Sequence, residues 1–314
     1  MKILVTDGLE ADAVASLRIV HEVVVSELDP KGLLDAIPAY HALIVRSRTK
    51  VTKEVLARGS ALRVVGRSGV GVDNIDVAEA TARKIAVVNA PAASTVSVAE
   101  LALGHMISLY RHMPLADRSV KEGKWEKKRL EGRELYGKVL GLVGSGRIGA
   151  EVAKRAQAFG MRVIAYDPYL PPGVAHAIGV ALVDKEDLLR EADVVSIHAA
   201  LTAETRGLIG RRELSMMKRT AIVVNCARGE IVQEAALAEA LSQGTISGAA
   251  LDVFENEPPT GSPILKAPNV MFTPHLGAST HEAQVRASAI IADQVLKVLA
   301  GARPEYLVNP EVYG

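Results

Sequence analysis

Three polar residues that could together carry carbonyl–alcohol chemistry stand after predicted β-strands: Arg228, Glu257 and His275. A histidine can exchange a hydroxyl proton near neutral pH. A carboxylate beside it fixes the ring tautomer and favours the imidazolium. A guanidinium can bind a substrate carboxylate through two parallel hydrogen bonds and polarise the adjacent carbonyl. Because ligands bind outside the carboxyl ends of strands in open α/β sheets, these residues form a coherent catalytic set.

A structural role competes with a functional one for each polar residue taken alone. A single strand-end histidine is more often structural than catalytic, and we interpret His198, which has no evident partner, in that way. Glu257 lies in ENEPP, which could be a solvated turn, and Glu255 is a second carboxylate in that segment. The single cysteine, Cys226, has no general base near it in sequence. We interpret it as a small apolar wall residue, with a reactive thiol as the alternative.

A glycine-rich motif follows an apolar run and begins a helical pattern: Gly144, Ser145, Gly146, Arg147, Ile148, Gly149. Such a motif is frequent by chance, but here a second strand and Asp167 follow at the distance typical of a dinucleotide site. The glycines would allow a tight turn, approach of a pyrophosphate and close helix packing, and the helix N-terminus would bind phosphate. Asp167 would accept hydrogen bonds from the ribose hydroxyls and repel a 2′-phosphate. The predicted cofactor is therefore NAD, with a purely structural glycine turn as the alternative.

Short apolar runs alternate with helical patterns along the chain, which predicts parallel sheets covered by helices on both faces. The predicted strands are 2–6, 21–26, 42–45, 62–66, 85–89, 138–144, 162–167, 193–198, 221–225, 246–252 and 270–274. Residues 95–112 predict a long helix, small and apolar nearly all round and therefore buried, followed by a second helix beyond Pro114. We expect an α/β fold of two domains. Residues 1–96 plus 284–314 would form a flavodoxin-like substrate domain and residues 97–283 a Rossmann-type NAD-binding domain, because helix 280–300 could pack back on the first domain.

Composition excludes several classes of protein. The 314 residues carry a net charge of +1, and 49% of them are hydrophobic, which predicts a large core and no nucleic-acid partner. No apolar run is long enough to span a bilayer and the N-terminus is no signal sequence, so we expect a cytoplasmic protein without a membrane partner. We expect neither a disulfide nor a metal site.

The runs NCARGEIV, GAALDVFENEPP and PHLGAST resemble the NAD-dependent D-2-hydroxyacid dehydrogenases. Earlier stretches, including LIVRSRTKVT, VVGRSGVGVDNIDV and GLVGSGRIG, match the same family in order, so the similarity covers nearly the whole chain. The resemblance implies reversible oxidation of 3-phospho-D-glycerate to 3-phosphohydroxypyruvate, the entry step to serine, by a homodimer. It also implies a short form of the enzyme, without a regulatory domain beyond Gly314. The alternatives are a glyoxylate, hydroxypyruvate or D-lactate type reductase and, in another class, an NADH-binding corepressor.

The resemblance also assigns roles to individual residues. Arg228 matches the catalytic arginine, His275 the acid/base and Glu257, rather than Glu255, its carboxylate partner. The positions on the substrate side are Arg46, Ser47, Arg67 and Gly69, where the two arginines would bind phosphate and carboxylate. Besides the glycine-rich motif and Asp167, the positions on the cofactor side are Val70, Cys226, Ala227, Arg228, Asp252, His275, Gly277 and Ala278. The basic residues Lys124, Lys127 and Lys128 resemble a segment that reaches a neighbouring subunit in some members, although a solvated face is an equal alternative.

Two positions depart from the family pattern. Ala199 stands in HAALT where the family often has HTPLT, and Val70 stands where threonine is frequent. Both changes remove a side-chain hydroxyl on the cofactor side. They put cofactor affinity in doubt, but not the acid/base set.

Overall fold

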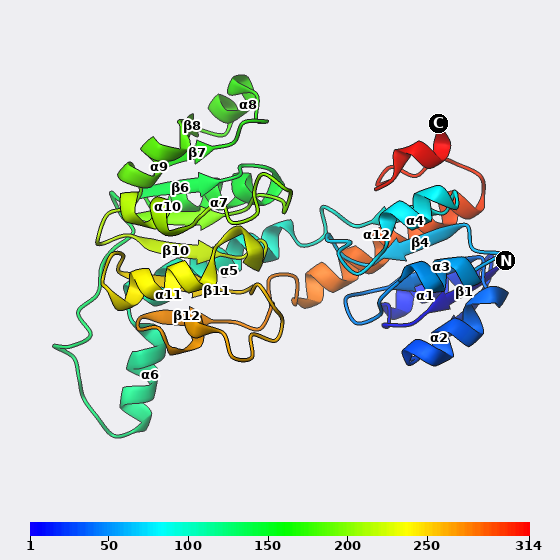
Figure 1. The fold of residues 1–314 in the computed structure, drawn as a ribbon, viewed down its shortest axis with the longest axis horizontal. Helices are drawn as coiled ribbons and strands as arrows, with labels where there is room; N and C mark the ends of the chain where they lie inside the picture. Colours follow the sequence, from blue (N-terminus) through cyan, green and yellow to red (C-terminus); the bar gives the residue numbers. More distant parts are fainter. The chain divides into compact units, whose positions relative to one another are not determined.

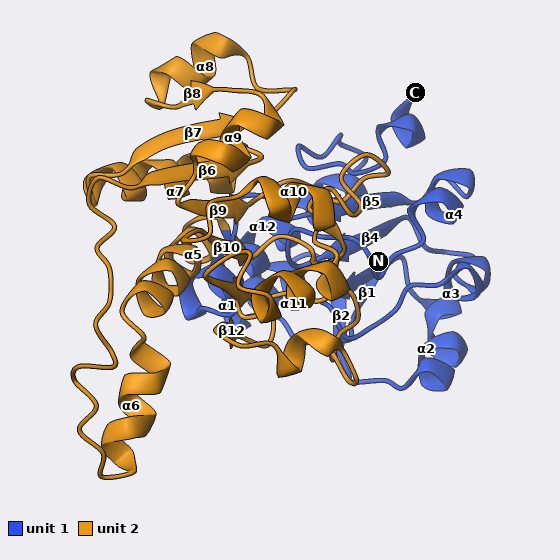
Figure 2. Ribbon diagram, turned by 60° about the vertical axis from the view of Figure 1, so that its left-hand side comes forward, with its two compact units in different colours: residues 1–94, 278–314 blue, residues 95–277 orange.

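The computed structural model describes residues 1–314, which fold into two compact units (Figures 1 and 2). Unit 1 comprises residues 1–94 and 278–314, and unit 2 comprises residues 95–277. The expected domain boundaries, after residues 96 and 283, fall slightly later in the chain. No helix is both long and apolar enough to cross a membrane.

Unit 1 is built around a five-stranded parallel sheet in the order β2-β1-β3-β4-β5. Its strands are β1 (Lys2–Val5), β2 (Glu22–Val25), β3 (Ala42–Val45), β4 (Val64–Arg67) and β5 (Ala86–Asn89). Its helices are α1 (Ala11–Arg18), α2 (Pro30–Ala36), α3 (Lys53–Arg58), α4 (Val77–Ala82) and α12 (His281–Leu299), with 3-10 turns at Ile37–Ala39 and Pro310–Tyr313. One face of the sheet packs on α1 and α12 and the other on α2, α3 and α4. This strand order is that of flavodoxin-like folds.

Helix α12 belongs to unit 1 because its apolar side chains pack closely against β4. A Cβ atom on Gly66 would lie 2.8 Å from Val295 and 3.0 Å from Ile291. Both of these α12 side chains are fully buried. The absent side chain of Gly66 therefore lets the helix approach the strand closely.

Unit 2 is a seven-stranded parallel sheet in the order β12-β11-β10-β9-β6-β7-β8. Its strands are β6 (Val139–Val143), β7 (Arg162–Tyr166), β8 (Ala181–Leu182), β9 (Val194–Ile197), β10 (Ile222–Asn225), β11 (Gly248–Leu251) and β12 (Val270–Phe272). Its helices are α5 (Thr95–Tyr110), α6 (Met113–Lys121), α7 (Arg147–Ala158), α8 (Pro172–Ala177), α9 (Lys185–Glu191), α10 (Arg211–Met216) and α11 (Glu234–Ser242), with 3-10 turns at Gly229–Ile231 and Pro263–Lys266. Helices α5 and α7 cover one face, and α9, α10 and α11 the other. The order is the dinucleotide-binding one, extended by a seventh strand.

The fold class predicted from the sequence is confirmed, with two corrections of detail. Strand β8 was not predicted, because its two residues carry too little periodicity to recognise. Helix α5 is not buried all round: Val96, Glu100 and Gly104 form an exposed stripe at four-residue spacing. Apolar composition alone therefore overestimated its burial.

Candidate active site and dinucleotide site

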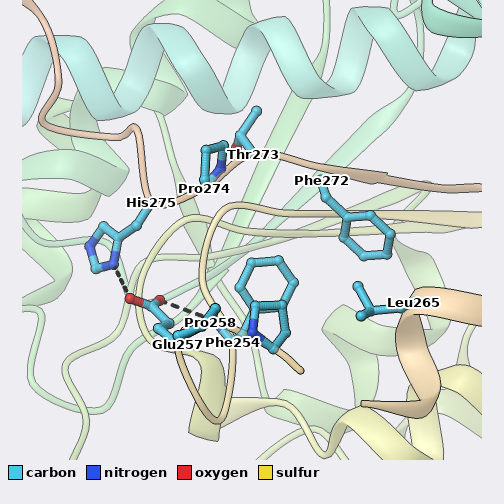
Figure 3. A pocket seen from close by; sticks show the side chains of 9 residues that line it. Phe254, Glu257, Pro258, Leu265, Phe272, Thr273, Pro274 and His275 are labelled. Carbon is cyan, nitrogen blue, oxygen red and sulfur yellow. Dashed lines mark hydrogen bonds and ion pairs between the residues drawn. The ribbon is translucent and has the colours of Figure 1, made fainter. Parts of the chain in front are cut away.

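His275 and Glu257 lie together at the carboxyl end of the unit 2 sheet. His275 Nδ1 is 2.7 Å from Glu257 Oε2, and the other carboxylate oxygen of Glu257 accepts a hydrogen bond from the Phe254 amide (Figure 3). His275 follows β12, and Glu257 belongs to the loop after β11. Adjacent strands of a parallel sheet thus bring together two residues that are eighteen positions apart.

The pair is electrostatically coupled. The hydrogen bond that His275 donates to Glu257 is the main cause that raises the pKa of His275, against a smaller opposing effect of burial. Burial would raise the pKa of Glu257, but the hydrogen bond and charge of His275 outweigh it and lower that pKa. The site therefore favours an imidazolium beside a carboxylate.

Glu255, the competing carboxylate, has other partners. Its Oε1 accepts the Glu234 amide at 2.8 Å, and its own amide donates to Glu234 Oε1 at 2.6 Å. Glu234 begins helix α11. Glu255 therefore joins its loop to a helix, while Glu257 faces His275.

Arg228 is held in the turn that follows β10. The buried Asn225 accepts the Ala227 amide at 3.0 Å and donates from its side-chain amide to the Arg228 carbonyl at 2.9 Å. Gly229 must be glycine because a Cβ there would lie 1.9 Å from the Phe254 carbonyl carbon. The charge of Arg228 is a minor contribution that opposes the raised pKa of His275 and adds to the lowered pKa of Glu257, so Arg228 lies in the neighbourhood of the pair.

A cavity of about 390 Å³ opens beside the His275–Glu257 pair (Figure 3). Its walls are predominantly apolar: Phe254, Pro258, Pro259, Leu265, Phe272 and Pro274. The pair therefore lies at the edge of an apolar cavity, with side chains that are 51% and 39% exposed to solvent.

The glycine-rich motif has the geometry expected of a dinucleotide site. Gly144 has φ +86°, and a Cβ there would meet the Ala199 amide nitrogen at 2.7 Å. A Cβ on Gly149 would lie 2.6 Å from the Gly144 carbonyl oxygen, whereas Gly146 has open space around it. One glycine thus allows the turn, one allows the helix to pack, and the space at Gly146 is left for a ligand.

A second cavity of about 390 Å³ runs from this motif along the ends of β6, β7 and β9. Asp167 lies in its wall, where its two carboxylate oxygens accept the amides of Ser145 at 2.8 Å and Tyr169 at 3.0 Å. Two buried polar atoms near the motif, Ser145 Oγ and His198 Nδ1, have no hydrogen-bond partner. The open space at Gly146, the Asp167 carboxylate and these two unpaired polar atoms fit NAD as the ligand. The sequence did not predict that His198, Thr202 and Thr205 line this cavity. All three follow the end of β9, at the point where the strand order reverses.

The remaining residues predicted on the cofactor side have varied surroundings. Arg147 is exposed at the start of α7, and Ile148 is half-buried behind it. Cys226 is buried, and burial raises the pKa of its thiol, which supports a wall residue rather than a nucleophile. The amide of Gly277 donates to Asp252 Oδ2 at 2.9 Å. The basic residues Lys124, Lys127 and Lys128, which are not on the cofactor side, are all exposed.

The residues predicted on the substrate side lie in unit 1, at the ends of β3 and β4. The Arg46 amide donates to Asp7 Oδ2 at 2.7 Å, and its guanidinium donates to Gln284 Oε1. Burial would raise the pKa of Asp7, but hydrogen bonds from Thr49, Arg46 and Arg48 outweigh it and lower that pKa. Ser47 follows Arg46 in the same loop and is exposed. The buried carboxylate thus anchors the loop that carries Arg46.

Arg67 folds over a glycine at the end of β4. A Cβ on Gly69, whose φ is +152°, would lie 1.5 Å from Arg67 Nη1. The next residue, Val70, is fixed through its carbonyl, which accepts the Asn89 side-chain amide at 2.6 Å. At the start of the second segment of unit 1, the Ala278 carbonyl accepts the Gln284 side-chain amide at 2.6 Å.

Comparison with known proteins agrees with this geometry. Residues 103–277 match the family described as D-isomer specific 2-hydroxyacid dehydrogenase, NAD binding domain. The D-3-phosphoglycerate dehydrogenase of Methanocaldococcus jannaschii is 53% identical over 98% of this chain, which spans 59% of that relative. The hydroxypyruvate reductase of Thermotoga maritima is 46% identical over 95% of this chain and 98% of its own length.

A solved structure has the same fold. The crystal structure of the TT0316 protein of Thermus thermophilus superposes with a TM-score of 0.90 at 38% identity, covering 98% of this chain and 100% of that one. The family match covers more than half of the chain and coincides with unit 2, where the dinucleotide motif lies. The chain belongs to the D-isomer specific 2-hydroxyacid dehydrogenases and contains their NAD-binding domain.

Proposed function

We propose that this chain catalyses the reversible NAD-dependent oxidation of 3-phospho-D-glycerate to 3-phosphohydroxypyruvate, the first step of serine biosynthesis. The observation that carries the proposal is the 2.7 Å contact between His275 and Glu257 beside Arg228, in the unit that holds the dinucleotide motif. The substrate is proposed from four relatives that match nearly the whole chain at 44–53% identity and carry the name D-3-phosphoglycerate dehydrogenase.

In this mechanism His275 is the acid/base. Glu257 engages Nδ1, so Nε2 is the ring nitrogen that remains to take the C2 hydroxyl proton. Glu257 then stabilises the imidazolium, and Arg228 binds the substrate carboxylate and the developing carbonyl. When bound, NAD supplies the nicotinamide that accepts hydride. The glycine-rich motif with Arg147 and Ile148, Asp167, Val70, the 226–228 turn, Asp252 and the 275–278 segment are proposed to hold it.

Recognition of the phosphate is proposed for Arg46 and Arg67 of unit 1, with Ser47 and Gly69. Arg46 follows β3 and Arg67 is the last residue of β4, so both lie at the carboxyl end of a parallel sheet, where ligands bind in such folds. The contacts of the Arg46 loop with Asp7 hold it in place, and Arg67 lies against Gly69. Ordered arginines offer the planar donor geometry that suits phosphate and carboxylate.

The test is an NADH-absorbance assay with 3-phosphoglycerate, D-glycerate and D-lactate, using NAD or NADP. We expect turnover with NAD and the highest kcat/KM for 3-phosphoglycerate. The Arg46→Ala change should lower that kcat/KM by roughly 30- to 1,000-fold, as for loss of one partner of a hydrogen-bonded charge pair, and should leave D-glycerate almost unchanged. Arg58→Ala, an exposed cation on α3, is the matched control. Equal losses with both acids, or near-normal turnover by His275→Ala, would refute the proposal.

Hydroxypyruvate reduction is the second candidate, favoured by the match to nearly the full length of the Thermotoga maritima hydroxypyruvate reductase. The same acid/base pair would then deliver a proton to a substrate that lacks phosphate. Arg46→Ala would in that case leave kcat/KM for hydroxypyruvate close to that of the unmodified protein.

We also propose a cytoplasmic homodimer. The supporting observation is an apolar surface on α6 and the segment after it, where Met113, Leu115, Val120 and Trp125 are exposed. This part of unit 2 extends away from its sheet (Figure 1). Met113 and Val120 lie seven residues apart on one face of α6, and several exposed apolar side chains on one segment favour an association surface. The location in the cytoplasm is proposed from the metabolic character of the reaction.

A further inference from the structure

A chain of four side chains runs through unit 2 and ends next to His275. Cys226 Sγ lies 3.7 Å from His105 Nδ1, and His105 Nε2 lies 3.2 Å from Thr273 Oγ1. Thr273 Oγ1 is 2.5 Å from Asp252 Oδ1. His105 and Asp252 are both almost completely buried. These contacts join helix α5 to the segment between β12 and His275.

The hydrogen bonds in this chain have one direction. An ionised carboxylate only accepts, so the single hydroxyl proton of Thr273 is donated to Asp252. Thr273 Oγ1 then accepts from His105 Nε2–H, which leaves Nδ1 as the acceptor for the Cys226 thiol. Burial lowers the pKa of His105, which keeps its ring neutral with a single N–H, as this order requires.

Asp252 anchors the segment that carries His275. Its carboxylate accepts the amides of Leu276 at 2.7 Å and Gly277 at 2.9 Å, and its carbonyl accepts the His275 amide at 2.9 Å. His275 itself has φ +54°, a conformation that costs energy outside glycine. The three contacts with Asp252 hold that conformation in place.

We propose that His105 and Thr273 are positioning residues that keep the Asp252 carboxylate directed at the 275–277 backbone, and thereby set the orientation of His275. The proposal rests on the dehydrogenase function proposed above. Neither residue touches the reacting groups: each acts through Asp252. Together they supply the side-chain hydrogen-bond donor of the buried Asp252 carboxylate, whose other partners are backbone amides.

The charged groups that face His275 show how the effect would be transmitted. Glu257, through its hydrogen bond, is the main cause that raises the pKa of His275; Asp252 adds to it, and burial and Arg228 oppose it. Asp252 is also the charged group that acts on His105. Without the Thr273 hydroxyl, the Asp252 carboxylate loses its side-chain donor and is free to turn away from the 275–277 backbone. A carboxylate that has moved away raises the pKa of His275 less, so that pKa falls.

The experiment is an NMR titration of the His275 imidazole, assigned by comparison with His275→Gln, together with kcat and thermal unfolding. Thr273→Val removes the donor to Asp252, and His105→Leu removes the N–H that orients this donor, whereas Thr273→Ser and His105→Gln retain the respective group. Tyr110→Phe is the matched control, because it removes a hydroxyl that α5 donates to the Asp193 carbonyl, away from Asp252.

We expect Thr273→Val and His105→Leu to lower the pKa of His275 and to reduce kcat by roughly 10- to 100-fold, the scale expected for a misplaced catalytic group. The donor-retaining variants should recover both values. The proposal is overturned if both donor-free variants lose thermal stability as Tyr110→Phe does while His275 titrates unchanged. If Thr273→Val does not fold, the comparison of His105→Leu with His105→Gln decides. Because the titration needs no substrate, failure of turnover would count against the proposed function alone.

Discussion

At the scale of single residues, the His275–Glu257 pair is held in its charged form. The pKa of His275 is raised chiefly by Glu257. Burial would raise the pKa of Glu257, but the contributions of His275, the Phe254 amide and Arg228 together outweigh it and lower that pKa. A base must be neutral to take a proton, so oxidation should be fastest above the raised pKa of His275 and reduction fastest below it. The rate measured in each direction therefore depends on pH through this one group.

Replacing Glu257 with glutamine tests this coupling. Without the anion the pKa of His275 falls, so the alkaline rise of kcat/KM for oxidation should move to lower pH. The plateau should drop by roughly 10²- to 10⁴-fold, because the imidazolium loses its partner. Glu255→Gln is the control, since Glu255 interacts with Glu234 and should change stability but not the pH midpoint. An unchanged midpoint in Glu257→Gln would contradict the assignment.

At the scale of elements, contacts between residues far apart in the chain position the loops that carry Arg228 and Glu257. The turn carrying Arg228 packs through Gly229 directly on the backbone at Phe254, three residues before Glu257. The same loop is tied to the start of α11 by the reciprocal contacts of Glu234 and Glu255. The distance between Arg228 and the His275–Glu257 pair is thus set by two loops and one helix together.

The second and third glycines of the motif at β6, Gly146 and Gly149, should respond differently to alanine. Gly146→Ala meets no atom within 4 Å, so stability should change by less than about 1 kcal/mol while NADH affinity falls, because the methyl group would occupy the pyrophosphate position. Gly149→Ala would place a Cβ 2.6 Å from the Gly144 carbonyl oxygen and should cost roughly 1–3 kcal/mol of unfolding free energy. Urea unfolding and NADH fluorescence titration measure the two effects. Equal losses of stability in both variants would show that the glycines do not have separate roles.

The sequence predicted the elements better than the contacts among them. Apolar runs before Arg228 and His275 placed these residues at strand ends, because a buried parallel strand has a recognisable length and composition. The choice between Glu255 and Glu257 stayed open from residue types, since it depends on the start of α11, which lies in another part of the chain. The link from His105 to Thr273 spans 168 positions and left no local signal.

At the scale of the whole molecule, both sheets reverse their strand order next to the residues that could bind ligands. In unit 1 the chain crosses from β2 past β1 to β3, after which Arg46 follows. In unit 2 it crosses from β8 past β6 to β9, after which His198 follows. Crevices form at such reversals because neighbouring connections leave on opposite faces of the sheet. Alternation of strands and helices predicted two parallel sheets, but strand order is a property of the folded chain.

The proposed homodimer can be tested at α6, where several large apolar side chains of unit 2 are exposed close together in the chain. We expect light scattering to give twice the mass of the chain, and replacement of Met113, Leu115 and Val120 together by glutamine to give a monomer with unchanged circular dichroism. These side chains are 52%, 46% and 58% exposed, so their loss removes no core packing. The matched control replaces Ile19 and Val20, which are 84% and 64% exposed in unit 1, and should leave the dimer intact. A monomeric unmodified protein, or a triple variant that stays dimeric, would show that α6 is not the association surface.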